Sequence, residues 1–147
     1  MCASYRLDSI APDLVELGER LSERERQVVA QRVAEWACRI SGVASYLGDA
    51  RLGYLLNRDN AATEDERHQL NQDIEALDER CFALQDGDDE TVNADDCLGW
   101  FSKARAVAAL LYSLDSRLQS DFCEAIYEAH AATDDVESLR RLCQQHA

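Results

Sequence analysis

The stretch of sequence that most suggests chemistry is an acidic run, Asp86-Gly87-Asp88-Asp89-Glu90. Carboxylates grouped around a glycine are typical of loops that bind calcium. An EF-hand loop that begins at Asp86 needs glycine at its sixth position and glutamate at its twelfth. Those positions hold Thr91 and Cys97. Because the required glycine and glutamate are absent from these positions, we predict no dedicated calcium site in this run.

The histidines and cysteines also lack the spacing that metal binding or nucleophilic catalysis requires. The sequence has no CxxC pair and no HExxH motif. Cys123 and His130 are two helical turns apart, roughly 10 Å, which is too far for a direct hydrogen bond. Serine nucleophile elbows and phosphate-binding loops are missing as well. We therefore predict no catalytic residues, no metal and no cofactor. An enzyme with an unrecognised site would need a deep cleft with converging polar side chains.

The cysteines and the first residues of the sequence indicate the cellular compartment in which the protein resides. Cys38, Cys81, Cys97 and Cys123 fall in helical, partly apolar segments, where a free cysteine behaves as a small hydrophobic residue. We therefore expect reduced core thiols in preference to disulfides. The opening MCASYRLDSI has no basic region followed by an apolar run, and no window approaches 18 apolar residues. These features predict a cytoplasmic protein.

The net charge is −14, from 15 basic and 29 acidic residues. This charge disfavours nucleic acids and anionic membranes as partners, and it permits a basic protein partner. The acid is concentrated: residues 61–96 hold 13 acidic residues against Arg67 and Arg80, a net of −11. Two interpretations remain open. The acids form a surface that is complementary to something positive, or they are a solvated helix face followed by an acidic loop.

Capping and stop signals divide the chain into helices. Ser22 and Glu25 form a capping box that opens a helix over 23–40, and Gly42 is a natural stop. Thr63 and Glu66 form a second box that opens a helix with a narrow apolar seam. Pro12 suits the first turn of a short helix through residue 21. Further helices are expected over 43–58, 95–114 and 118–132, and Thr133 can cap a last helix that holds Val136, Leu139, Leu142 and Cys143.

The segment 95–114 is the most apolar segment of the chain, and we predict that it lies at the centre of the fold. Its apolar residues cover most of the helix circumference, which is typical of a buried helix. We expect Trp100 and Phe101 to be mostly buried, and Phe101→Ala to cost about 3–5 kcal/mol. One proline and six glycines in 147 residues argue against an all-β fold. The predicted fold is all-α, a single-domain antiparallel bundle of six or seven helices over residues 1–147.

Two segments resemble known bacterial families. They are LSERERQVVAQRVAEW over 21–36, and CLGWFSKARAVAALLYSL over 97–114, which follows the acidic run. This arrangement is similar to a small all-helical family of unassigned function, of the YjaG type. It also resembles the compact acidic helical immunity proteins encoded beside secreted bacterial toxins, including type VI and Rhs-type effectors. The resemblance implies tight binding to one cognate toxin, usually by blocking its active site.

A contact surface for such a toxin is predicted on the helix that starts at Thr63 and on the loop that follows it. Clustered acids can occupy a basic cleft in place of phosphate and can steer the encounter. Lasting affinity needs a buried anchor, for which Tyr46 and Tyr54 are candidates. The alternative function is a helical regulatory or scaffolding domain unrelated to toxins. The predicted partner-binding residues are Asp78, Glu79, Asp86, Asp88, Asp89, Glu90, Asp95 and Asp96.

Overall fold

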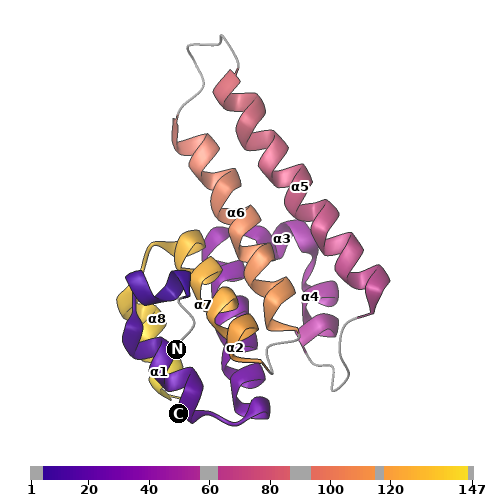
Figure 1. The fold of residues 1–147 in the computed structure, drawn as a ribbon. Helices are drawn as coiled ribbons and strands as arrows, with labels where there is room; N and C mark the ends of the chain where they lie inside the picture. Colours follow the sequence, from indigo (N-terminus) through magenta and orange to yellow (C-terminus); the bar gives the residue numbers. More distant parts are fainter. Residues whose placement is uncertain (1–4, 57–62, 87–93, 115–117, 146–147) are drawn as a thin grey trace.

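The computed structural model describes residues 5–56, 63–86, 94–114 and 118–145, and within them every regular element is a helix. Eight α-helices and one short 3-10 helix pack together (Figure 1). The predicted all-α bundle is therefore confirmed. In chain order the elements are η1 (Arg6–Ser9), α1 (Pro12–Arg20), α2 (Glu23–Ser41), α3 (Val43–Leu47), α4 (Asp49–Leu56), α5 (Glu64–Asp86), α6 (Ala94–Ser113), α7 (Gln119–Thr133) and α8 (Val136–Gln145).

The predicted capping boxes begin two of the three longest helices, α2 and α5. At α2, the Glu25 amide donates to Ser22 Oγ at 3.2 Å, and the Ser22 amide donates to Glu25 Oε1 at 3.0 Å. Thr63 and Glu66 make the same reciprocal bonds at the start of α5, at 3.2 and 3.0 Å. Each box satisfies amide groups that have no partner within the helix.

Two expected helix boundaries differ from the prediction. Within the predicted helix over 43–58, the described residues up to Leu56 form two short helices, because Gly48 between α3 and α4 adopts φ +93°, a conformation that glycine accepts without a Cβ penalty. This division yields one helix more than the upper predicted number. The last helix is capped by Asp135, whose carboxylate accepts from the Ser138 amide at 3.1 Å. Thr133, the predicted cap, ends α7 instead and donates its hydroxyl to Ala129 O at 2.9 Å.

One hydrophobic core takes side chains from every helix, and α6 lies at its centre. That helix packs against α2, α3, α5 and α7, and Val107, Ala109 and Leu110 are completely buried. The predicted central position of this segment is therefore correct. Within the described ranges, no helix combines the length and apolarity needed to cross a bilayer.

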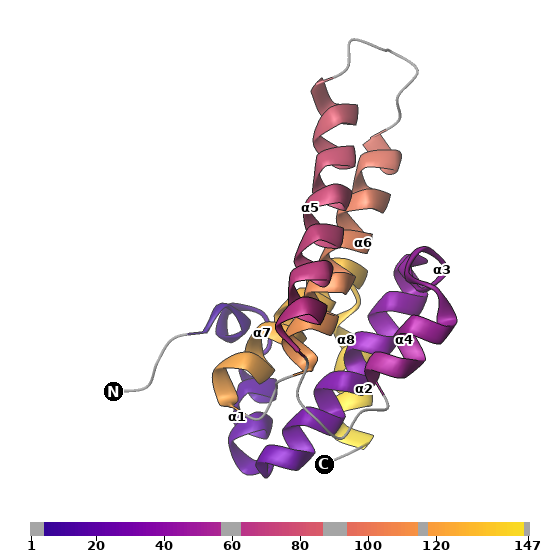
Figure 2. The ribbon, with the colours of Figure 1, turned by 90° about the vertical axis from the view of Figure 1, so that its right-hand side faces the viewer.

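Helices α5 and α6 form an antiparallel hairpin that projects from the rest of the bundle (Figures 1 and 2). The end of α5 and the start of α6 extend beyond the other helices. This geometry corrects one prediction. Phe101 lies in the projecting half of α6 and is 40% exposed, and Trp100 is only partly buried. An apolar circumference does not bury a helix where the neighbouring helices have ended.

Helix α1 closes over α7 through a glycine contact. A Cβ atom built on Gly18 would lie 2.5 Å from Gln119 Oε1 and 2.6 Å from Phe122 Cδ1. The Phe122 ring is completely buried at this contact. Next to it, Gln119 Nε2 donates to Val15 O at 2.8 Å, and this bond ties the start of α7 to α1.

Candidate functional site

Helix α5 carries the described part of the predicted contact surface. Of the eight predicted residues, Asp78 and Glu79 have described side chains. Asp86, Asp95 and Asp96 lie in the helical backbone of α5 and α6, but their side chains are outside the described part. Asp88, Asp89 and Glu90 lie outside the described residues altogether.

The two described residues have different environments. Asp78 is half-buried and forms an ion pair with Arg105 of α6, at 3.1 Å between its Oδ2 and Nη2 of the arginine. Glu79 is exposed. Asp78 therefore helps to hold α5 against α6. Of these two predicted residues, Glu79 is the one that a partner could reach.

Glu79 belongs to a solvent-facing row along α5, which we call the α5 outer face. Its six members are spaced three or four residues apart, so they share one side of the helix, and all six are exposed. Three are acids and none is a lysine or arginine. The α5 outer face consists of Glu64, His68, Gln72, Glu75, Glu79 and Phe82.

Phe82 is the apolar member of this face, and 61% of its surface is exposed. An aromatic ring is the type of side chain that supplies large contact area when a partner buries it. The sequence offered Tyr46 and Tyr54 as anchors, and they are 43% and 63% exposed on α3 and α4. Phe82 was missed, although its spacing from Glu75 and Glu79 places it on their side of the helix.

A network of ion pairs connects the hairpin to the bundle behind the α5 outer face. Arg105 donates to Asp78 at 3.1 Å and to Glu128 of α7 at 3.2 Å. Glu128 is only 3% exposed, and it also accepts from Arg6 of η1 at 3.1 Å. Arg6 pairs in addition with Glu124. The hydrogen bond to Glu124 is the main cause that raises the pKa of the Arg6 guanidinium above its ordinary value.

Sequence reasoning missed this network because its members come from four helices. One sign was available: Glu128 stands among Ala125, Ala129 and Ala132, which are all buried. An acid on the apolar side of a helix must find a cation when it is buried.

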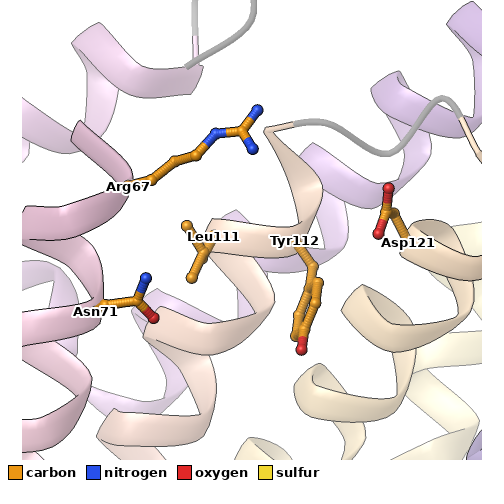
Figure 3. A pocket seen from close by; sticks show the side chains of 5 residues that line it. All are labelled: Arg67, Asn71, Leu111, Tyr112 and Asp121. Atoms are coloured by element: carbon orange, nitrogen blue, oxygen red, sulfur yellow. The ribbon is translucent and has the colours of Figure 1, made fainter. Parts of the chain in front are cut away.

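A cavity of about 250 Å³ lies between the first half of α5, the end of α6 and the start of α7. Figure 3 shows Arg67 reaching from α5 past Leu111, Asn71 pointing from α5 toward Leu111, and Asp121 on the far side. Burial raises the pKa of Asp121, and the charge of Arg67 acts in the opposite direction. Tyr112 of α6 also lines this cavity.

Cys81 corrects the thiol prediction, because it is disulfide-bonded and 6% exposed. A disulfide requires two Cβ atoms about 4 Å apart, and residue spacing along a chain does not reveal which helices meet so closely. Cys38 and Cys123 are free and buried, in line with the predicted core thiols, and Cys143 is free and buried as well. The side chain of Cys97 is outside the described part.

Among the described residues, no group of three or more His, Cys, Asp or Glu side chains could hold a metal ion. The rejected calcium loop falls largely on residues outside the described ranges.

Comparisons of the chain with protein-family models, with curated protein sequences and with solved structures gave no match. The resemblance to helical immunity proteins therefore stays a prediction that depends on two short segments.

Proposed function

We propose that this chain is an immunity protein, which binds a cognate secreted bacterial toxin and covers the toxin's active site. The observation that carries the proposal is the α5 outer face. It presents Glu64, Glu75 and Glu79 to solvent without a basic residue, and it adds the exposed ring of Phe82. The contact surface extends along the acidic segment up to Asp96.

The chemistry of this face fits a basic cleft with an apolar recess. Enzymes that act on nucleic acids or nucleotides hold phosphate groups with lysine and arginine, and a row of carboxylates can take the place of those phosphates. Exposed charges mainly accelerate the encounter. Lasting affinity comes from apolar groups that become fully desolvated, and Phe82 supplies such a group at the end of the α5 outer face, next to Glu79.

The rest of the proposal concerns what the protein lacks and where it acts. It is not an enzyme, needs no metal or cofactor, and binds neither nucleic acid nor membrane. We place it in the cytoplasm. The disulfide at Cys81 is the observation that speaks against this placement, because cytoplasmic thiols are kept reduced. Alkylating cells before lysis and locating Cys81 by peptide mass spectrometry tests the placement: a free Cys81 thiol supports the cytoplasm.

The proposed function is tested with the protein encoded by the adjacent gene. Co-expression of the chain should rescue cells from that protein's toxicity, and the two purified proteins should form a complex. Failure of both rescue and binding contradicts the proposal and favours a regulatory or scaffolding domain unrelated to toxins.

The contact surface is tested with matched charge changes. The double variant Glu75→Gln/Glu79→Gln should associate with the toxin about tenfold more slowly at low salt, and its rate should depend less on salt. The control is Glu16→Gln/Glu19→Gln, which removes the same charge from exposed positions on α1. Equal rates for the two variants would show that the α5 outer face is not the interface.

A further inference from the structure

A recess of about 320 Å³ lies where the projecting half of α6 leaves the bundle. Phe101 and Ser102 of α6 form one wall, and the residues 130–134 at the end of α7 form the other. Phe101 and Asp134 are both exposed, so the recess opens to solvent. Its volume is at the lower end for ligand pockets, which suits a single side chain better than a large molecule.

Three features of this recess attract a cation. The 15-residue helix α7 ends there, and the last carbonyl groups of a helix carry partial negative charge. Asp134, directly after the helix, adds a carboxylate. Phe101 adds an aromatic ring, whose face attracts cations.

Arg105 shows that the Phe101 ring accepts a guanidinium, because its Cζ lies 5.7 Å from the ring centroid. The charge of Arg105 is balanced by its ion pairs with Asp78 and Glu128. It therefore does not oppose the entry of a second cation into the recess.

We propose that the recess between Phe101 and Asp134 receives one arginine side chain of a protein partner. A planar guanidinium can lie against the Phe101 ring while it donates hydrogen bonds to the Asp134 carboxylate and the carbonyl groups that end α7. The net charge of −14 favours a basic partner. This inference rests on the proposed function in one respect: the partner is a basic protein. It adds a second contact, which lies away from the α5 outer face.

The test uses a small probe and no toxin, so its failure is distinct from a failure of the proposed function. Acetyl-Gly-Arg-Gly-amide is titrated into the full chain, and backbone amide shifts are followed by NMR. The citrulline peptide is the neutral control of equal shape. Asp134→Asn removes the charge and keeps a residue that tolerates the positive φ of 50°. Glu137→Gln removes one charge from an exposed residue of α8 that does not line the recess.

We expect the arginine peptide to shift the amides of Ser102 and of 131–134, and the citrulline peptide to leave them unchanged. Asp134→Asn and Phe101→Ala should each weaken binding about two- to fivefold, and Glu137→Gln should not. Shifts that are absent or spread over the whole surface, or equal shifts with citrulline, would overturn the proposal. Much tighter binding of free agmatine would also overturn it, because the recess would then serve a small cationic molecule.

Discussion

Arg105 and Asp78 form an ion pair of 3.1 Å that joins the two helices of the projecting hairpin. The same guanidinium reaches Glu128 on α7 at 3.2 Å, so one side chain links the hairpin to the helix behind it. Because Glu128 is buried, it depends on Arg105 and Arg6 for compensation of its charge. Arg105 therefore stabilises both the contact between α5 and α6 and the contact of this hairpin with the rest of the bundle.

Replacing Arg105 with alanine should lower the free energy of unfolding by about 3 kcal/mol, because it leaves a buried carboxylate with one partner fewer. Urea denaturation measures this loss. The matched control is Arg39→Ala, which removes an exposed arginine that pairs with Glu35 one turn away on α2. That change should cost less than about 0.5 kcal/mol. Equal losses for the two variants would contradict the role assigned to Arg105.

Two phenylalanines in the apolar helices should respond differently to truncation. Phe122→Ala empties a fully enclosed site and should cost about 3–5 kcal/mol. Phe101→Ala should cost about 1 kcal/mol, because its ring is 40% exposed and the change leaves no closed cavity. Thermal and urea unfolding of both variants give the comparison. A loss at Phe101 as large as that at Phe122 would mean that the projecting half of α6 is covered.

The three free cysteines among the described residues should be unreactive in the folded protein. Burial raises the pKa of Cys38, Cys123 and Cys143 to about 12, so almost no thiolate is present at pH 8. Iodoacetamide should leave them unmodified for hours and should label all three after unfolding in guanidinium chloride. Peptide mass spectrometry locates the label. Rapid labelling of any of the three before unfolding would show that its thiol is accessible.

The capping box of α2 should be visible in the titration of Glu25. Hydrogen bonds from Ser22 lower the pKa of Glu25 below its ordinary value of 4.5. Because the folded state has the lower pKa, the ionised carboxylate stabilises the fold above that ordinary value. This contribution is lost as the pH falls through the folded-state pKa.

Ser22→Ala removes one side of the box, so the pKa of Glu25 should rise towards 4.5 in a carbon-detected NMR titration. Helix stability should fall by about 1 kcal/mol. Ser45→Ala, at an exposed serine inside α3, is the control and should change neither the pKa of Glu25 nor the stability of α2. An unchanged pKa of Glu25 in Ser22→Ala would contradict the contribution of the Ser22 side chain to the lowered pKa.

Local chemistry explains which helices were predictable. The boxes at Ser22 and Thr63 place the starts of α2 and α5 correctly, because the bonds involved lie within four residues. The centrality of α6 follows from its apolar composition. The exposure of Phe101 does not, because it depends on where α2 and α7 end in space. Periodicity reports which side of a helix is apolar and not how far its neighbours extend.

The candidate site was predictable only in part, for the same reason. Charge counting located the acids of α5 correctly, and their helical spacing identifies Glu79 as outward-facing. The same counting could not separate Asp78 from Glu79, because Arg105, the partner of Asp78, is 27 residues further along the chain. The recess at Phe101 combines residues from α6 and α7 that no local pattern connects.

The close contact between Gly18 and Phe122 has a consequence for sequence divergence. Any side chain at position 18 would collide with the Phe122 ring unless α1 moved away from α7. The two positions are therefore expected to change together: a relative with alanine at 18 should carry a smaller residue than phenylalanine at 122. Such paired substitution would identify distant members of this fold even where the acidic surface has been replaced.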